Sequence, residues 1–414
     1  MGVFFYFINN FIICTQNKIK KARLNMNKIR LCTVAILILL CTMVIIVGDT
    51  FNVSAQVVSN MSAPSYILMD CNGNILESKN PHEKREVASI CKLMTTLITL
   101  ENIEKGNITL EDKFYASAYA CDAEGSQAFL DAGKEYYVSD LLKSVIIASA
   151  NDSAIVLAEN IAGSEKQFVE IMNARAKELG MSNTNYSNST GLPTGEQYST
   201  AFDTAILLNE VSQFEIYKKD CQIWMDELVH ESGRKTELVN TNRLIKYYNY
   251  CKTGKTGFTD EAGYCLSSTA SKDNLNLTCV VLGCQSPADR FTDSVSLYNY
   301  GFANFASEKI IDSTVELDKT LAVKSGKETI IKLMPANDYF LTVKKTDKQQ
   351  YSLEYDLPND VKAPIIRGDK VGSVFVVVNN EKIAEIDIVA KDNIEKQDYL
   401  DIVNKIVNKY AIVK

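Results

Sequence analysis

The sequence predicts an α+β fold, in which an antiparallel sheet with a helical block precedes a small all-β sandwich and a terminal amphipathic helix. Strand-like segments lie near both ends of residues 56–306, with helical segments between them, and short strand-like runs fill residues 307–392. Residues 393–414 carry a helical apolar stripe, and residues 1–55 have the composition of an export segment. A chain of 414 residues suits two or three domains of roughly 100–200 residues each.

The export segment has three parts in the order typical of a signal peptide. A cluster of lysine and arginine precedes the uncharged apolar run 31–48, and Val53-Ser54-Ala55 then offers small residues to a peptidase. We expect cleavage near Ala55, with an uncleaved membrane anchor as the alternative, because the apolar run is near the minimum length for a span. Met26 offers a more natural start than Met1. The mature chain is then expected at the outer face of the cytoplasmic membrane or in the cell wall.

The first domain is expected to pair strands from its two ends in one sheet. A hairpin is predicted at 66–76, around the turn Asn72-Gly73-Asn74. Apolar spacing predicts helices, and runs rich in Val, Leu, Thr and Cys predict strands. The expected helices are 89–100, 139–148 with Ser139 as N-cap, 152–162, 168–179 closed by Gly180, 210–217, 221–229 and 294–305; the expected strands are 264–270 and 275–284.

The second domain is predicted to be a β-sandwich, because short strand-like runs alternate with turn residues such as Ser325-Gly326 and Asn379-Asn380. The expected strands are 313–317, 321–323, 328–333, 339–344, 351–355, 370–378 and 382–389. In the helix expected at 395–413, one face carries Tyr399, Ile402, Val403, Ile406, Val407, Tyr410 and Val413. That face suits a membrane surface, or alternatively docking on the β-module.

Composition excludes several classes of function. A net charge of -7 argues against nucleic acid as a partner. Two histidines, His82 and His230, are too few for an obvious zinc site or a histidine-based hydrolase. Eleven scattered cysteines show no CxxC pair, so both disulfides and buried free thiols stay open. We therefore expect no metal or cofactor.

Ser89-Ile90-Cys91-Lys92 supplies a candidate nucleophile and base. Residues at positions i and i+3 of a helix share a face, and burial lowers a lysine pKa, so a neutral Lys92 could accept the Ser89 proton. By itself Ser-x-x-Lys is weak, since about one or two are expected by chance in such a chain, often as helix starts with solvated lysines.

Two further motifs follow in order. Ser149-Ala150-Asn151 lies between two predicted helices, where simple capping is the plainer explanation. Lys255-Thr256-Gly257 precedes a turn and a strand; its glycine would permit close approach of a ligand, and Lys255 with Thr256 could bind a carboxylate. Lys252-Thr253-Gly254 presents the same letters three residues earlier and is a decoy.

Together the three motifs resemble the ordered triplet of active-site-serine penicillin-recognising enzymes. The sequence around these motifs resembles that of the low-molecular-mass D-alanyl-D-alanine carboxypeptidases, which have a DD-peptidase/β-lactamase-like catalytic domain. The match runs densely over 60–305 and more loosely beyond, and it selects Lys255 over Lys252. The resembling segments are 86–95, 148–154, 172–181, 187–193 and 255–266. Cys91 stands where this family often has Thr, and we expect its thiol to make the site sensitive to oxidation.

The resemblance implies removal of the terminal D-alanine from peptidoglycan stem peptides through a Ser89 acyl-enzyme, with β-lactam antibiotics as mimics of the substrate. It implies Lys92 as base and Ser149 as proton relay. Asn151 would bind the substrate amide, and Lys255 and Thr256 the carboxylate beside Gly257. The backbone N–H groups of Ser89 and Phe258 would form the oxyanion hole.

Three rival functions share some of these features. A β-lactamase has the same triplet but needs a separate deacylating carboxylate and no β-module. An endopeptidase would act on wall cross-links. A wall-binding scaffold with a silent site would not need every motif residue to be intact.

Overall fold

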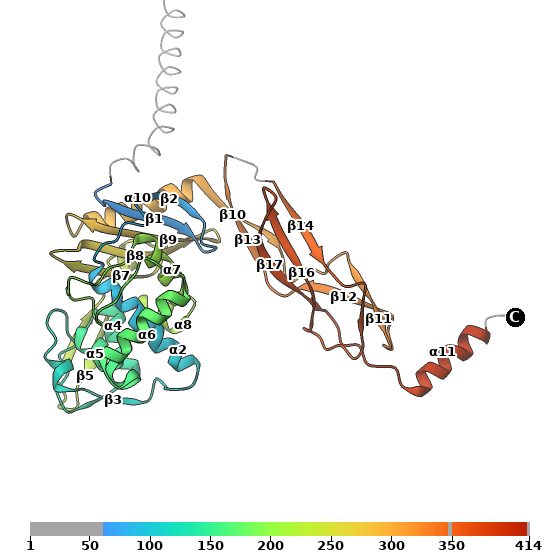
Figure 1. Cartoon of the computed structure of the whole chain (residues 1–414), viewed down its shortest axis with the longest axis horizontal. Helices are drawn as coiled ribbons and strands as arrows, with labels where there is room; N and C mark the ends of the chain where they lie inside the picture. Colours follow the sequence, from blue (N-terminus) through green and yellow to red (C-terminus); the bar gives the residue numbers. More distant parts are fainter. Residues whose placement is uncertain (1–60, 347–349, 412–414) are drawn as a thin grey trace, which may run out of the picture. The chain divides into compact units, whose positions relative to one another are not determined.

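The computed structural model describes residues 61–346 and 350–411. The export segment predicted at residues 1–55 lies outside the described residues. Across the described ranges, no helix is both long and apolar enough to cross a membrane. The predicted α+β class is confirmed: an antiparallel sheet with helices precedes a β-rich body and a short terminal helix (Figure 1).

Strands from the two ends of the first domain do pair, as predicted. The five-stranded sheet has the order β2-β1-β9-β8-β7 and is antiparallel throughout. β1 and β9 join its halves, with Ser65 opposite Leu282. The bounds are β1 Ser65–Asp70, β2 Ile75–Lys79, β7 Cys251–Thr259, β8 Gly263–Lys272 and β9 Leu275–Cys284. β7 is the last strand of this order, so one of its sides has no strand partner among the residues that the structure describes.

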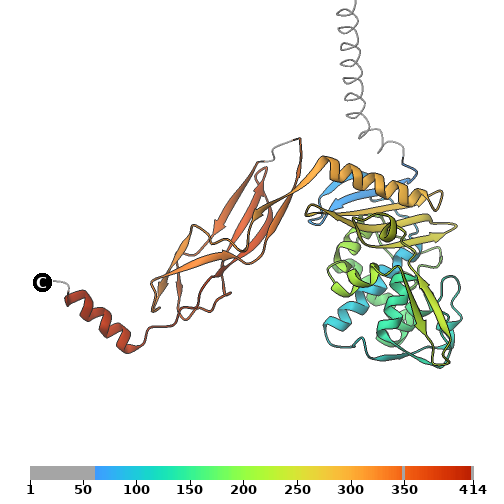
Figure 2. The ribbon, with the colours of Figure 1, turned by 180° about the vertical axis from the view of Figure 1, so that it is seen from behind.

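Helices cover both faces of this sheet (Figures 1 and 2). α10 (Asp289–Asn304) packs on one face, and α7 (Ala201–Val211) packs on the other. α2 (Lys92–Glu104) runs through the core of the helical block, because its residues from Lys92 to Leu100 are all buried. The block also contains α3 Ala118–Cys121, α4 Val138–Ile147, α5 Asn151–Ala162, α6 Glu165–Glu178, α8 Glu215–Cys221 and α9 Leu244–Tyr247. Two small sheets lie beside these helices: β3 Lys113–Tyr115 pairs with β4 Glu135–Tyr137, and β5 Met225–Val229 pairs with β6 Lys235–Val239.

Some predicted elements are wrong. The helix expected at 221–229 is instead the end of α8 followed by strand β5, which gains a pairing partner in β6 through the turn at Gly233. The helix expected at 210–217 divides between α7 and α8. Ser139 is not an N-cap: Tyr137 takes that position because β4 runs directly into α4.

The β-rich body contains a six-stranded sheet, β14-β16-β17-β12-β11-β15, and a two-stranded sheet, β10-β13. Its core is aliphatic, with Leu333, Val376 and Ile388 fully buried. The strand predicted at 313–317 is a turn, because Asp312 and Asp338 bind its backbone and hydroxyls. The bounds are β10 Phe305–Ile311, β11 Thr320–Lys324, β12 Ile330–Pro335, β13 Tyr339–Lys344, β14 Tyr351–Asp356, β15 Asp360–Lys362, β16 Lys370–Val378 and β17 Glu381–Ala390.

The terminal helix α11 spans Tyr399–Ala411, which is shorter than the predicted 395–413. Several of its apolar side chains are exposed, namely Tyr399, Leu400, Ile402, Ile406 and Val407.

Candidate active site

The candidate nucleophile lies in a short 3-10 turn, η1 (Ala88–Cys91), which leads into α2. Ala88 has φ +49, a left-handed conformation that a non-glycine residue holds only when the surroundings enforce it. Lys92 opens α2 and has no exposed surface. Its Nζ donates to Ser89 Oγ at 2.9 Å, so the turn brings the two side chains of Ser-x-x-Lys into direct contact.

The second contact of Lys92 is with a loop distant in sequence. Its Nζ also donates to the carbonyl oxygen of Thr190 at 2.6 Å. Burial lowers the pKa of Lys92 to about 7, although the charges of Cys91 and Asp152 act in the opposite direction. A large fraction of the amine is therefore neutral near pH 7, and a neutral amine can accept the Ser89 proton.

Ser149 lies between α4 and α5, as its motif predicts. It has φ +64 and is almost fully buried, so this backbone too is held in a strained conformation. Lys255 Nζ donates to Ser149 Oγ at 2.6 Å and to the carbonyl oxygen of Thr256 at 3.1 Å. Burial, and then the positive charges of Lys92 and Arg290, hold the pKa of Lys255 well below its usual value. Lys92 therefore lies close enough to Lys255 to lower its pKa.

Asn151 is the first residue of α5 and keeps one polar atom free. Its Nδ2 donates to the carbonyl oxygen of Glu124 at 2.5 Å, and its backbone N–H donates to Ser126 at 2.7 Å. Its Oδ1 is buried and has no hydrogen-bond partner within the described part of the chain. Since a buried acceptor without a partner is costly, this oxygen is suited to an incoming amide N–H.

Strand β7 carries Lys255-Thr256-Gly257 past the nucleophile turn. A Cβ on Gly257 would lie 2.5 Å from the Val87 carbonyl oxygen, so only glycine allows this approach. Thr256 Oγ1 donates to Thr241 Oγ1 at 2.7 Å. Phe258 is half-exposed and stacks on Tyr264 with ring centroids 4.3 Å apart. Strand β7 therefore places the contact between Lys255 and Ser149 beside the turn that holds the contact between Lys92 and Ser89.

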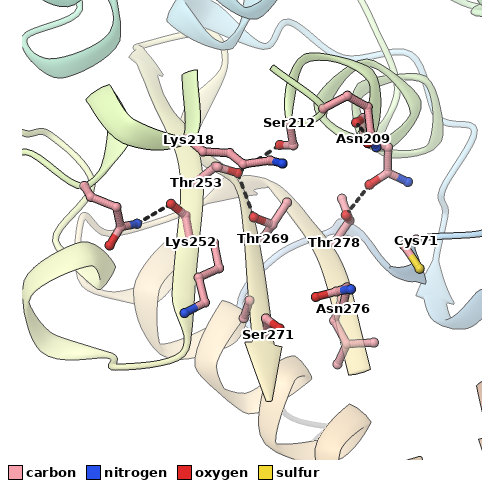
Figure 3. Close-up of a pocket in the computed structure, with 14 residues that line it drawn as sticks. Cys71, Asn209, Ser212, Lys218, Lys252, Thr253, Thr269, Ser271, Asn276 and Thr278 are labelled. Atoms are coloured by element: carbon pink, nitrogen blue, oxygen red, sulfur yellow. Dashed lines mark hydrogen bonds between the residues drawn. The ribbon is translucent and has the colours of Figure 1, made fainter. Parts of the chain in front are cut away.

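Lys252, the decoy, faces a different region. It lines a cavity of about 750 Å³ whose walls include Thr253, Thr269 and Ser271, and none of the candidate catalytic residues (Figure 3). Ser212, Thr253 and Thr269 form a chain of hydroxyl contacts of 3.0 and 2.7 Å there. The exposed Lys252 and the buried Lys255 therefore have distinct surroundings although they share a motif.

Sequence reasoning assigned no role to several residues that contact the motifs, among them Thr190, Gly191 and Arg290. Gly191 has φ +86, and a Cβ there would lie 2.0 Å from the Ala88 carbonyl oxygen, so the loop at 187–193 packs directly on the nucleophile turn. Arg290 Nη1 donates to the carbonyl oxygen of Gly257 at 3.1 Å, which adds positive charge beside β7. Gly191 lies in the segment 187–193, whose resemblance to the family was a signal for its importance. The sequence of α10 contains no comparable signal for Arg290.

The cysteine expectations can now be compared with the fold. The eight cysteines in the described ranges are free thiols, and six of them are buried. Burial raises the pKa of Cys91 to about 12, so its thiol stays protonated. The thiolate is the form that oxidises readily, so the raised pKa argues against the expected oxidation sensitivity at Cys91. No group of three or more His, Cys, Asp and Glu within 61–346 and 350–411 could hold a metal ion.

Two family descriptions match the sequence in succession. Residues 50–286 match D-alanyl-D-alanine carboxypeptidase, and residues 305–396 match the C-terminal domain of penicillin-binding protein 5.

Curated relatives carry the same description. D-alanyl-D-alanine carboxypeptidase DacF of Bacillus subtilis (strain 168) is 34% identical over 354 residues, covering 85% of this chain and 91% of that protein. DacC of Escherichia coli (strain K12) is 30% identical over 352 residues, covering 81% and 85%. A D-alanyl-D-alanine endopeptidase of the same strain is 30% identical over 241 residues, covering 57% of this chain and 76% of that protein.

Solved structures extend the similarity to both domains. Penicillin-binding protein 5 from Haemophilus influenzae has a TM-score of 0.65 at 29% identity, covering 81% of this chain and 98% of that one. A peptidoglycan synthesis regulatory factor (PBP3) from Streptococcus pneumoniae has a TM-score of 0.70 at 26% identity, covering 81% and 100%.

Proposed function

The chain belongs to the D-alanyl-D-alanine carboxypeptidase family and is a serine-type hydrolase of that class, and from this premise we propose the roles of its own residues. The substrate is a peptidoglycan stem peptide ending in D-Ala-D-Ala, and Ser89 is its nucleophile. The observation that carries this assignment is the contact of 2.9 Å between the buried Lys92 amine and Ser89 Oγ.

In the acylation step, neutral Lys92 accepts the Ser89 proton while Ser89 Oγ attacks the carbonyl carbon of the penultimate D-alanine. The backbone N–H groups of Ser89 and Phe258 bind the resulting oxyanion, and such a donor contributes about 3–4 kcal/mol of transition-state stabilisation. The C–N bond then breaks. Ser149, in contact with Lys255, passes its hydroxyl proton to the departing amine and takes up the proton held by Lys92, so Lys92 is neutral again and D-alanine leaves.

In the second step, water attacks the ester carbonyl. Lys92 accepts the proton of that water, the C–O bond to Ser89 breaks, and Lys92 returns the proton to Ser89 Oγ, which restores the starting enzyme. β-Lactam antibiotics would acylate the same serine and leave slowly, because their ring-opened product keeps the leaving group attached.

Substrate binding uses the remaining motif residues. The free Oδ1 of Asn151 accepts a substrate amide N–H, and Lys255 with Thr256 holds the terminal carboxylate. The charge of Arg290 beside Gly257 supports an anion at this end of the peptide. Gly257 lets the peptide backbone lie close to β7.

Mass spectrometry after incubation with a labelled penicillin tests the proposal, together with D-alanine release from a stem pentapeptide. We expect one adduct, on the peptide containing Ser89, and loss of both adduct and release in Ser89→Ala. An adduct elsewhere, or an active Ser89→Ala enzyme, would overturn it. Rapid penicillin turnover instead of a stable adduct would indicate a β-lactamase.

The organisation of the whole chain is a further part of this proposal. We assign export to residues 1–55, catalysis to 56–306, a β-sandwich to 307–392 and a membrane-surface helix to 393–414. The relatives support a wall-associated role. The exposed apolar residues of α11 support contact with a lipid surface. After cleavage of the signal peptide near Ala55, this helix would be the part of the chain that holds the enzyme at the membrane.

A further inference from the structure

The loop that receives the Lys92 amine is attached to α2 at several points. Besides the Lys92 contact with Thr190, Thr95 Oγ1 donates to the Ser189 carbonyl oxygen at 2.7 Å. Cys91 Sγ lies 3.3 Å from the Asn188 carbonyl oxygen. Three consecutive carbonyl groups of this loop therefore face the end of η1 and the first turn of α2, which carries the base. Their positions decide where the amine can lie.

A carboxylate holds the same loop from the opposite side. Glu165 Oε1 accepts the Ser189 backbone N–H at 2.9 Å and the Ser189 hydroxyl at 2.6 Å. Its Oε2 accepts the Tyr119 hydroxyl at 2.9 Å. Glu165 is the first residue of α6, where the helix dipole favours a negative charge. Ser189 has no exposed surface, whereas Glu165 is partly exposed, so this double contact is buried on the Ser189 side only.

We propose that Glu165 is a positioning residue for acylation. Its two hydrogen bonds fix Ser189, and this fixes the position of the neighbouring Thr190 carbonyl oxygen. That oxygen in turn orients the Lys92 amine toward Ser89. Glu165 makes no contact with the reacting atoms and acts only through Ser189 and Thr190. The inference rests on the proposed roles of Lys92 and Ser89. Charge-assisted bonds are the strong ones, and a misplacement of about 1 Å at a reacting group can slow a reaction about 100-fold.

The neighbouring carboxylate Glu159 offers a matched control. It lines the same cavity of about 460 Å³ as Glu165 and is also partly buried. Its Oε2 accepts the Ser117 hydroxyl at 2.7 Å, at the start of α3, and makes no hydrogen bond to the 187–193 loop. Glu159→Ala therefore removes a negative charge from this region without loosening Ser189.

The test compares Glu165→Ala, Glu165→Gln and Glu159→Ala for acylation by a chromogenic β-lactam, with stopped-flow separation of the dissociation constant from the acylation rate constant. We expect Glu165→Ala to lower the acylation rate constant about tenfold or more, from the loss of hydrogen bonds to a charged group, with little change in the dissociation constant. Glu165→Gln should retain at least about a third of the rate, because its amide oxygen can accept both Ser189 bonds. Glu159→Ala should stay within about twofold of the unchanged enzyme.

Ser189→Ala keeps the test decisive if Glu165→Ala folds poorly. It removes only the hydroxyl bond, and it should slow acylation less than Glu165→Ala does. The double variant should be no slower than Glu165→Ala alone, because both changes act through one contact. Unchanged acylation in Glu165→Ala, equal losses in Glu165→Gln and Glu165→Ala, or additive effects in the double variant would each overturn the inference. If the unchanged enzyme forms no Ser89 adduct at all, the proposed function itself fails instead.

Discussion

Lys92 Nζ lies 2.9 Å from Ser89 Oγ, and the Lys92 side chain is completely buried. An amine in this position is useful as a base only when it is uncharged. The burial that brings its pKa to about 7 is therefore part of the chemistry of the site.

The pH dependence of acylation follows from this pKa. Below pH 7 the amine is protonated and cannot accept the Ser89 proton, so the acylation rate should fall about tenfold per pH unit, and above pH 7 it should level off. Lys92→Arg, which stays charged, should lower the rate about 10²- to 10⁴-fold above pH 7 and remove this pH dependence. Stopped-flow acylation between pH 5 and 9 measures both. A flat profile across about pH 7 would contradict the role of Lys92 as base.

The two Lys-Thr-Gly runs give a matched pair of variants. Lys255→Ala removes a buried amine in contact with Ser149, and kcat/KM for D-alanine release should fall about 10- to 100-fold or more, the effect of losing a hydrogen bond to a charged group. Lys252→Ala changes an exposed lysine at a separate cavity and should leave kcat/KM within about twofold. Equal effects of the two substitutions would mean that the motif has been assigned to the wrong register.

Alanine variants of Gly191 and Gly195 can distinguish the effect of backbone strain from the effect of crowding at the nucleophile turn. Both have φ near +80, so backbone strain alone should cost either glycine-to-alanine variant about 1–2 kcal/mol of stability, measured by thermal unfolding, with a further loss at Gly191 from the clash. Only at Gly191 does the new Cβ meet the Ala88 carbonyl oxygen, whereas Gly195 has nothing within 4 Å. Gly191→Ala should therefore also lose penicillin acylation. Full acylation by Gly191→Ala would show that the loop does not define the nucleophile turn.

The terminal helix can be tested by binding to lipid vesicles. A chain starting at residue 56 should sediment with anionic vesicles, and removal of residues 399–414 should abolish this, because the exposed residues Leu400, Ile402 and Ile406 would be lost. Penicillin acylation in solution should be the same in both chains. Undiminished vesicle binding by the shortened chain would remove the proposed membrane role of α11.

Much of the fold was predictable because its signals are local. The hairpin of β1 and β2, the glycine after α6 and the asparagine turn before β17 each follow from short-range patterns. Strand β5 was mistaken for helix because its short mixed run has no clear period, and only pairing with β6 decides its conformation. The same limit applies at Ser139, where the preceding strand sets the start of α4.

The candidate site divides in the same way. The motif residues were found by letter and order, since Ser89 and Lys92 are neighbours on one turn. Thr190, Glu165 and Arg290 reach them only through contacts between distant parts of the chain, which no periodicity encodes. The left-handed backbone at Ala88 and Ser149 could not be predicted either, because non-glycine residues rarely adopt positive φ and the sequence gives no sign of it.

The position of β7 at the border of its sheet has a consequence for selectivity. We expect a peptide that binds along this strand to be recognised chiefly through its backbone amide groups, which do not distinguish one side chain from another. Discrimination must therefore come from stereochemistry at the α-carbon and from the free carboxyl end. A bicyclic drug that reproduces those two properties needs no resemblance to any side chain in order to be mistaken for the natural ligand.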